Sequence, residues 1–321
     1  MPLIIGTRGS DLALWQARHI QQLLGGEAAG VTLEIIRTTG DKILDIPLQG
    51  QLDKGFFTKE LETALLERRI DVAVHSLKDL PTQMPAGLVL AAVPQRADVN
   101  DLLLIHRDSV DATQPLNLRH GARVGTSSLR RIALLKHAAP QAHAAFLRGN
   151  VPTRLNKVDT GELNAVILAR AGVSRLRLRA PNVLAFDLNP RLWLPAAAQG
   201  ALGIQARLGD PDVVAQLNKL QDAATLQAVD LERGLLRRIE GGCHSAFGAL
   251  AEMLEAPAQA TLRAGLSAPD GTWHSLVVTG RPADLVENAY AAVQAILGGG
   301  TQAVEAADGA ESWACPAAAW F

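Results

Sequence analysis

Arginines and hydroxyl side chains gather at three predicted strand-to-helix junctions in the middle of the chain. The first junction, within VGTSSLRRI, places two arginines in the first turn of a helix, where the macrodipole disfavours cations. Backbone N–H groups and hydroxyls at a helix start bind anions, and arginine adds two-pronged recognition of carboxylate or phosphate. The junctions therefore predict a ligand with several anionic groups. Their residues are Thr126, Ser127, Ser128, Arg130, Arg131, Arg148, Gly149, Asn150, Thr153, Arg154, Arg170 and Arg175.

Two stretches nearer the N-terminus carry related chemistry. TRGSDLALW places Arg8 and Ser10 at another strand-to-helix turn, and HSLKDLP ends a predicted strand with Ser76, Lys78 and Asp79. An aspartate that faces a cationic cleft stays ionised and acts as an acid, a base or a stabiliser of positive charge. An aspartate before Leu-Pro is equally typical of a capped turn, so both interpretations of Asp79 remain open.

The cysteine and histidine positions offer fewer possibilities. Only Cys243 and Cys315 occur, which excludes a disulfide framework and predicts no metal site. Cys243 follows two glycines in RIEGGCHSAFG, so it is either a reactive thiol in an open loop or a small buried apolar residue. A Cys–His hydrolase is disfavoured, because no group that would orient His244 is apparent. We interpret His75 as a packed strand residue.

The charge of the chain is unevenly distributed. The net charge is −1, yet residues 101–193 contain fourteen Lys and Arg against six Asp and Glu, a local charge of +8. This segment is either a solvated basic face or a site for an anionic ligand. Nucleic acid is disfavoured, because few aromatic residues accompany the basic ones, and neither of the glycine-rich nucleotide-binding motifs is present.

Composition narrows the class of protein further. Hydrophobic residues make up 48% and charged residues 20% of the 321 residues, which is typical of a globular chain. No apolar run approaches the roughly 18 residues of a membrane span. The chain begins with a predicted strand, PLIIGT, where a secretory signal has a basic and then a long apolar stretch. We therefore expect a cytoplasmic protein with no membrane partner.

The apolar pattern predicts an α/β fold of two periplasmic-binding-protein-like lobes and a small C-terminal α+β domain. Strand-like runs alternate with helical patterns through both lobes, which is typical of parallel sheets with ligands at the strand ends. We expect domain 1 at 1–97 together with 198–217, and domain 2, with the basic loops, at 98–197. Domain 3, which carries Cys243, follows at 218–300, and the tail at 301–321 is expected to be poorly ordered.

Seven motifs together resemble those of one known family, in the same order along the chain. They are TRGSDLALWQA, DKGFFTKELE, HSLKDLP, VGTSSLRR, LRGNVPTRL, AAQGALGI and EGGC. The chain resembles hydroxymethylbilane synthase, also called porphobilinogen deaminase, from about Ile4 to Gly300. This resemblance implies a transferase of tetrapyrrole and heme biosynthesis. Such an enzyme adds four porphobilinogen molecules in turn, each with loss of ammonia, and then releases hydroxymethylbilane by hydrolysis.

The resemblance also assigns roles to single residues and implies a monomer. Cys243 corresponds to the residue that carries a dipyrromethane cofactor through a thioether, and Asp79 to the catalytic carboxylate. The cofactor-binding positions are Ser76, Lys78, Thr126, Ser127, Ser128, Arg130, Arg131 and Gly149. The positions that handle the substrate and growing chain are Arg8, Ser10, Lys54, Phe57, Arg148, Arg154, Arg175, Gln199 and Gly200. On this reading the paired arginines of TSSLRR hold carboxylates of the cofactor and product chain.

The chain departs from the family pattern at several places. Ala198 stands where glycine is usual, Gln205 where an acid is common, and Asp53 where the active-site loop has a glycine. HSAFG follows the cysteine in place of the usual sequence. Arg170 stands where a small residue is frequent, so it is either an additional carboxylate contact or a surface residue. None of these departures removes a predicted catalytic group.

An alternative from another class is a two-lobed, periplasmic-type carboxylate-binding protein. Paired α/β lobes with anion-binding helix starts suit a transporter component equally well. That alternative assigns no role to Asp79 or Cys243, and it predicts a signal peptide or an attached regulator domain. The ordered motifs favour the transferase.

Overall fold

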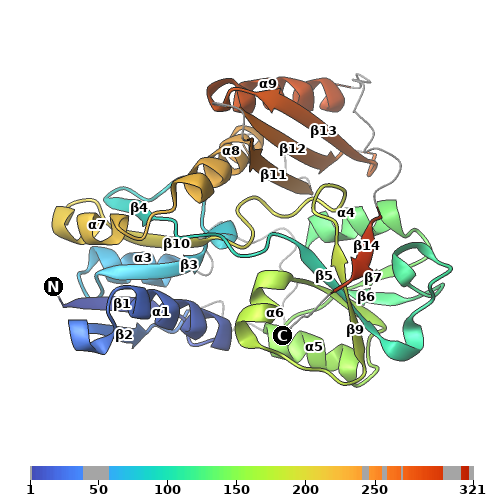
Figure 1. Ribbon diagram of the computed structural model, residues 1–321, viewed down its shortest axis with the longest axis horizontal. Coiled ribbons are helices and arrows are strands. Elements are labelled where there is room, and N and C mark those ends of the chain that lie inside the picture. The colour runs from blue at the N-terminus through green and yellow to red at the C-terminus, as the bar shows by residue number, and fades with distance from the viewer. Residues whose placement is uncertain are drawn as a thin grey trace. The chain divides into compact units, whose positions relative to one another are not determined.

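A computed structural model describes residues 2–38, 58–240, 246–254, 259–268, 270–298 and 312–317 (Figure 1). The chain forms two compact units, Met1–Ala97 with Gly200–Leu226 and Asp98–Gln199 with Gln227–Phe321. The second unit contains both a six-stranded and a three-stranded sheet. The division into three domains at the expected boundaries stays a prediction. No helix in the described residues is long and apolar enough to span a membrane.

The first unit is built on a five-stranded sheet in the order β2-β1-β3-β10-β4. β1 runs parallel to β2 and β3, while β10 is antiparallel to β3 and β4. One face packs against α1 and α7 through Ile5, Ile20 and Leu217, and the other packs against α3 through Leu61. The strands are β1 (Leu3–Thr7), β2 (Val31–Ile35), β3 (Val72–Ser76), β4 (Leu88–Ala92) and β10 (Leu202–Arg207). The helices are α1 (Asp11–Leu23), α3 (Lys59–Leu66) and α7 (Pro211–Asn218), with 3₁₀ turns Glu27–Ala29 and Leu77–Asp79.

The second unit contains a six-stranded sheet in the order β14-β9-β5-β8-β6-β7. β6 is parallel to β7 and β8, and β5 is antiparallel to β8 and β9. The strands are β5 (Asp101–His106), β6 (Arg123–Gly125), β7 (His143–Ala145), β8 (Ala165–Ala169), β9 (Val183–Leu188) and β14 (Ala314–Pro316). The helices are α4 (Leu129–Ala138), α5 (Val151–Asp159) and α6 (Arg170–Leu176), with 3₁₀ turns Arg107–Ser109 and Pro115–Asn117.

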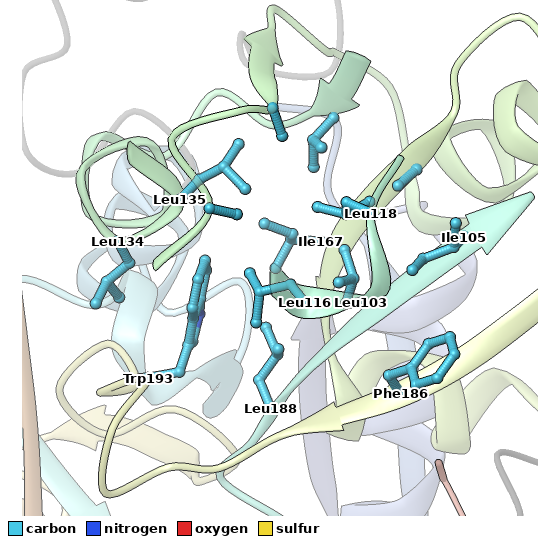
Figure 2. Close-up of a cluster of buried hydrophobic side chains, with 14 of the residues drawn as sticks. Leu103, Ile105, Leu116, Leu118, Leu134, Leu135, Ile167, Phe186, Leu188 and Trp193 are labelled. Carbon is cyan, nitrogen blue, oxygen red and sulfur yellow. The ribbon is translucent and has the colours of Figure 1, made fainter. Parts of the chain in front are cut away.

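Both faces of the six-stranded sheet are covered by hydrophobic clusters. Successive side chains of a strand point in opposite directions, so neighbouring residues of β5 belong to different clusters. Leu103 and Ile105 of β5 belong to a cluster that includes Trp193 and residues of α4 (Figure 2). Leu102 and Leu104 join a second cluster with residues of α5 and β8. All four leucine and isoleucine side chains are fully buried. This explains why DLLLI reads as an uninterrupted apolar run rather than an alternating one.

A small antiparallel sheet follows in the order β11-β12-β13. Its buried side chains, such as Leu262, pack against Leu235 of α8 and Leu285 of α9. The elements are α8 (Ala223–Glu240), β11 (Phe247–Met253), β12 (Ala260–Ser267), β13 (Trp273–Gly280) and α9 (Pro282–Leu297). The predicted fold class, two α/β lobes and a small C-terminal α+β part, is confirmed.

The tail differs from expectation at residues 312–317. Residues 314–316 form β14, which pairs antiparallel with the edge strand β9. The amide of Asn189 donates to the carbonyl oxygen of Trp313 at 3.0 Å, and the Trp313 side chain packs against the buried cluster around Trp193. An edge strand has unpaired backbone groups, which explains why a short Ala-rich segment becomes ordered here.

Candidate functional site

The first unit contains a pocket at the carboxyl ends of β1 and β3. Asp79 ends the 3₁₀ turn after β3 and is exposed, so its carboxylate is accessible to a ligand. Ser10 caps α1 by accepting the amide of Ala13 at 3.4 Å, and Ser76 accepts a hydrogen bond from Gln16 at 2.8 Å. The pocket is lined by Arg8, Ser10, Leu12, Ala13, Gln16, Thr58, Leu61, Val74, His75, Ser76 and Asp79.

His75 forms part of a buried polar contact below this pocket. Its Nε2 lies 3.1 Å from Oε1 of Gln205, whose Nε2 donates to Glu62 at 3.3 Å. Burial lowers the pKa of His75 to about 4; the hydrogen bond to Gln205 opposes this shift and the nearby Arg8 charge adds to it. The imidazole is therefore neutral at physiological pH. The interpretation of His75 as a packed strand residue agrees with this burial, although the ring also lines the pocket.

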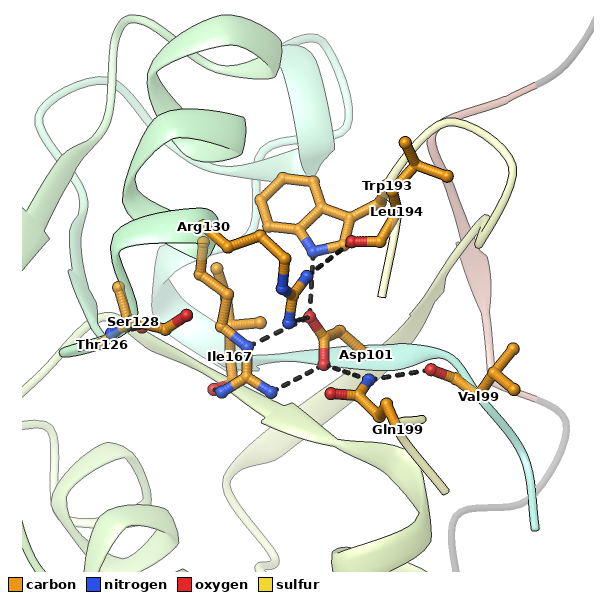
Figure 3. A network of polar contacts seen from close by, with 10 residues as sticks. Val99, Asp101, Thr126, Ser128, Arg130, Ile167, Trp193, Leu194 and Gln199 are labelled. Carbon is orange, nitrogen blue, oxygen red and sulfur yellow. Dashed lines mark hydrogen bonds and ion pairs between the residues drawn. The ribbon is translucent and has the colours of Figure 1, made fainter. Parts of the chain in front are cut away.

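The second unit contains the junction that carries the paired arginines, and their first partner is a carboxylate of the protein itself (Figure 3). Asp101, at the start of β5, is fully buried. Arg131 donates to it from Nε at 3.0 Å and from Nη2 at 2.6 Å, and Arg130 donates from Nη2 at 2.9 Å. The remaining Nη1 groups donate to the carbonyl oxygens of Ile167 and Leu194. The ion pairs with Asp101 therefore explain, without any ligand, how two cations are stabilised at the start of a helix.

The paired arginines are thus correctly located at the start of α4, but they point into the protein. Burial lowers the pKa of Arg130; Asp101 opposes this shift, and the neighbouring charge of Arg131 adds to it. The Nε of Arg130 is buried and has no hydrogen-bond partner among the described residues. An unsatisfied buried N–H costs about 1–3 kcal/mol, which a ligand oxygen would recover. That these two arginines hold ligand carboxylates stays a prediction.

Hydroxyl groups surround the same helix start. Ser128 is the N-cap residue of α4, and its amide donates to Oγ1 of the buried Thr126 at 3.2 Å. Ser127 is exposed between them. Gln199, from the QGA motif, donates to Asp101 at 2.8 Å and to the carbonyl oxygen of Val99 at 2.8 Å. The motif residue Gln199 therefore joins the same network as the arginines.

The second predicted junction lies between β7 and α5. Gly149 has a φ of +106°, a left-handed conformation that favours glycine, and a Cβ there would meet Thr153 at 3.0 Å. Asn150 caps α5 by accepting the amide of Thr153 at 2.9 Å. Arg154 donates to the carbonyl oxygen of Gly149 at 2.7 Å, and the guanidinium of Arg148 lies 6.0 Å from the centre of the exposed Phe146 ring. The glycine conformation lets the backbone turn into α5 beside both arginines.

The third junction, at the start of α6, separates its two arginines. Arg170 donates to Asp187 at 2.6 Å and to Asp98 at 3.0 Å, so it bridges two carboxylates of the protein. Neither earlier interpretation of Arg170, an extra ligand contact or a simple surface residue, described this bridge. For Arg175, burial lowers the pKa to about 10. A desolvated cation of this kind is stabilised by an anion.

The donor set fits a ligand that carries several carboxylates. Arg8 and Ser10 line the pocket with Asp79 in the first unit, while the second unit presents hydroxyls and arginines at three strand ends. The described residues of each junction include more cationic than anionic side chains. Three predicted site residues, Lys54, Phe57 and Cys243, lie outside the described residues.

Comparison with protein families decides which ligand this donor set suits. Residues 3–216 match a family model described as "Porphobilinogen deaminase, dipyromethane cofactor binding domain". A second model, for the porphobilinogen deaminase C-terminal domain, matches residues 226–290. The chain belongs to the porphobilinogen deaminase family. Its cofactor is dipyrromethane, as expected.

Curated porphobilinogen deaminases align with most of the chain. One from Nitratidesulfovibrio vulgaris (strain Miyazaki F) is 41% identical over 320 residues, covering 94% of this chain and 99% of the relative. Another, from Syntrophomonas wolfei, is 46% identical over 253 residues, covering 78% and 81%. Among solved structures, an ancestral cationic amino acid solute-binding protein covers 68% of this chain and 87% of its own, with 16% identity and a TM-score of 0.40.

The sequence of this porphobilinogen deaminase family member did not single out two buried acids. Asp101 is the first residue of the apolar strand β5, and the available signal was a carboxylate at the start of the buried run DLLLIH. Glu232, fully buried in α8, accepts the amides of Ala198 at 2.6 Å and Ala251 at 3.0 Å. Ala198 has a φ of +61°, which explains why glycine is usual there. The sequence did not distinguish Glu232 from the other charged residues of α8.

Proposed function

We propose that this protein is a hydroxymethylbilane synthase. It condenses four porphobilinogen molecules, each with loss of ammonia, and releases hydroxymethylbilane by hydrolysis for tetrapyrrole and heme biosynthesis. The observation that carries this proposal is the match to both porphobilinogen deaminase domains, which together extend over residues 3–216 and 226–290. The pocket with Asp79 and the arginine-bearing strand ends supply the chemistry that the reaction requires.

Asp79 is the proposed catalytic residue. Its carboxylate is exposed at the pocket, beside Ser76 and Arg8. Positive charge develops on porphobilinogen as ammonia departs, and a nearby carboxylate stabilises that charge. The same carboxylate accepts the proton lost when the new pyrrole link forms. Arg8 and Ser10, which also line the pocket, bind the acetate and propionate of the incoming substrate.

The dipyrromethane cofactor is proposed to be joined to Cys243 by a thioether. When bound, it supplies the pyrrole end to which substrate units are added. Its carboxylates are held by hydroxyls and cations of the chain: Ser76, Lys78, Thr126, Ser127, Ser128, Arg130 and Arg131, with the backbone at Gly149. The growing chain is handled by Lys54, Phe57, Arg148, Arg154, Arg175, Gln199 and Gly200. The positive charge of the segment 101–193 supports binding of a polycarboxylate.

The test is intact-mass measurement of the denatured protein before and after incubation with porphobilinogen, with peptide mapping around Cys243 and detection of released product. We expect a covalent addition of two pyrrole units and production of hydroxymethylbilane. Reversible binding of porphobilinogen, with neither a covalent addition nor a product, would instead support the carboxylate-binding protein.

We further propose that the protein acts as a monomer in the cytoplasm and requires no nucleic-acid or membrane partner. The family resemblance supports both the monomer and the cytoplasmic location. Light scattering of the purified protein tests the first point and cell fractionation tests the second.

A further inference from the structure

Asp101 is a buried acid to which the family resemblance assigned no role. Its two carboxylate oxygens together accept five hydrogen bonds. Its Oδ2 accepts from Arg130, Arg131 and Trp193 at 2.9, 3.0 and 3.1 Å. Its Oδ1 accepts from Arg131 and Gln199 at 2.6 and 2.8 Å. A carboxylate offers about four lone-pair sites, so these five donors occupy it fully. Asp101 therefore acts on other side chains and does not itself contact a ligand.

The hydrogen bonds fix both guanidinium groups in orientation. Arg131 meets Asp101 with two parallel N–H groups, an arrangement that is geometrically specific, and its third nitrogen donates to Ile167 at 2.8 Å. Arg130 is held between Asp101 and the carbonyl oxygen of Leu194, 2.7 Å away. Figure 3 shows Arg130 reaching the Asp101 carboxylate from the start of α4, and Arg131 donates to the same carboxylate.

The charges in this cluster do not balance. Among the described residues, these hydrogen bonds join two guanidinium groups and one carboxylate, and Trp193 and Gln199 carry no charge, so one positive charge remains. All three charged residues are less than 10% exposed. The N-terminus of α4 adds further positive potential. The buried Nε of Arg130 has no hydrogen-bond partner among the described residues.

We infer that Asp101 is a positioning residue: it holds Arg130 and Arg131 at the start of α4 in an orientation that leaves one positive charge for a ligand carboxylate. This inference rests on the proposed function, in which that carboxylate belongs to the dipyrromethane cofactor or the growing chain. Without Asp101 the two like charges repel each other and their guanidinium groups lose their fixed orientation.

The test compares Asp101→Asn with the control Asp187→Asn on the neighbouring strand β9. Asp187 on β9 lies in register with Leu102, and its carboxylate pairs with Arg170 at 2.6 Å, outside the proposed site. Apoprotein of each variant is incubated with porphobilinogen, and intact mass follows the rate of cofactor addition. Melting temperature is measured on the same samples, and KM and kcat on the loaded fractions.

We expect Asp101→Asn to slow cofactor addition and to raise KM by tenfold or more. Asp187→Asn is expected to change the rate of cofactor addition and KM by less than twofold. Both variants are expected to melt at a lower temperature than the parent. Asp101→Glu restores the charge and is expected to recover part of the loading rate. If Asp101→Asn does not fold, Asp101→Glu is compared with the parent, and a misplaced carboxylate is expected to raise KM at least threefold.

Two results would overturn the inference in different ways. If the unsubstituted protein neither gains the cofactor mass nor forms product, the proposed function fails and the inference fails with it. If the unsubstituted protein loads and turns over, but the folded Asp101 variant matches Asp187→Asn in loading rate and KM, Asp101 is a purely structural residue.

Discussion

At the residue scale, Asp79 and Asp101 are two aspartates of one chain whose surroundings differ, and we propose different roles for them on that ground. Asp79 is exposed at the pocket, whereas Asp101 is fully buried and saturated by N–H donors. An accessible carboxylate can exchange protons with a substrate. A buried carboxylate surrounded by donors stays charged and orients its neighbours. The motif HSLKDLP pointed to Asp79, whereas no sequence pattern pointed to Asp101.

Replacing Asp79 tests its proposed catalytic role. Asp79→Asn is expected to reduce kcat by about 10²–10⁴-fold, since general acid–base catalysis contributes that much. The unfolding free energy should change by less than about 0.5 kcal/mol, because the side chain is exposed. The control is Asp212→Asn, an exposed aspartate in the first turn of α7 in the same unit. Near-parental kcat in Asp79→Asn would show that another group carries the chemistry.

Replacing Cys243 tests the proposed attachment. Cys243→Ala is expected to show no covalent mass addition after incubation with porphobilinogen, because the alanine variant lacks the sulfur that forms the thioether. Cys315→Ala is the matched control, since Cys315 is the other thiol of the chain and is exposed on β14. Intact mass and peptide mapping decide between them. Loading of Cys243→Ala but not of Cys315→Ala would move the attachment to Cys315.

His75 gives a pH-dependent prediction. Its pKa falls from 6.5 in the unfolded chain to about 4 in the folded protein, mainly through burial. The unfolded state therefore binds the proton first as pH falls, and the associated stability, present above pH 6.5, is lost between pH 6.5 and 4. The loss is about 3 kcal/mol, at 1.36 kcal/mol per pKa unit.

The measurement is urea unfolding at several pH values between 4 and 7. His75→Gln should flatten the dependence of the unfolding free energy on pH by this amount, and His143→Gln, at an exposed position on β7, is the control. Equal pH slopes in the parent and His75→Gln would mean that other groups cause the acid sensitivity.

At the element scale, β14 shows how a segment with little sequence signal becomes ordered. β14 supplies hydrogen bonds along β9, with Cys315 in register with Asp187. Trp313 lies beside His137 of α4, with ring centres 5.8 Å apart. The segment thus closes one edge of the six-stranded sheet and also contacts a helix that covers it. An exposed edge of this kind otherwise promotes association between chains.

Removing residues 312–321 tests the contribution of β14. The amide of Asn189, which donates to Trp313, is expected to exchange with deuterium at least about tenfold faster in the shortened chain, because its hydrogen bond is lost. The amide of His106, which donates to Asn164, lies away from the tail and serves as the internal control. Unchanged protection of Asn189 would mean that β14 does not remain paired in solution.

At the scale of the whole molecule, the distribution of charge matters more than its total. The chain carries −1 overall but +8 over residues 101–193, which contain the three arginine-bearing junctions. Part of this charge is neutralised by acids outside the segment, as the ion pair between Arg170 and Asp98 shows. The remainder attracts polyanionic ligands over distances that salt controls.

Ionic strength is therefore expected to act on substrate binding. Raising NaCl from about 50 to 500 mM should increase KM for porphobilinogen roughly threefold or more, because the Debye length falls from above 10 Å to about 4 Å. The value of kcat should change less, since contacts formed in a closed site are screened weakly. Steady-state kinetics at constant pH measures both constants. A KM that is independent of salt would contradict electrostatic attraction as a contributor to binding.

The sequence by itself determined the α/β fold class, the strand ends that carry Arg8, Ser76 and Asp79, and the family. These features depend on local patterns: apolar runs and motifs whose residues are close in the chain. A strand followed by a helix start is recognisable from a dozen residues, so the positions of these side chains at strand ends follow directly.

The tertiary structure alone decided what the paired arginines contact and which buried acids matter. Asp101 meets Arg131 across 30 positions of sequence and Gln199 across 98, and Glu232 meets Ala198 across 34. The β14–β9 pairing likewise joins residues more than a hundred positions apart. Hydrogen bonds of this kind depend on how sheets and helices pack, and no local pattern encodes a partner so distant in the chain. The sequence shows two arginines at a helix start, where cations are disfavoured. Only the fold shows that both of them pair with the buried Asp101.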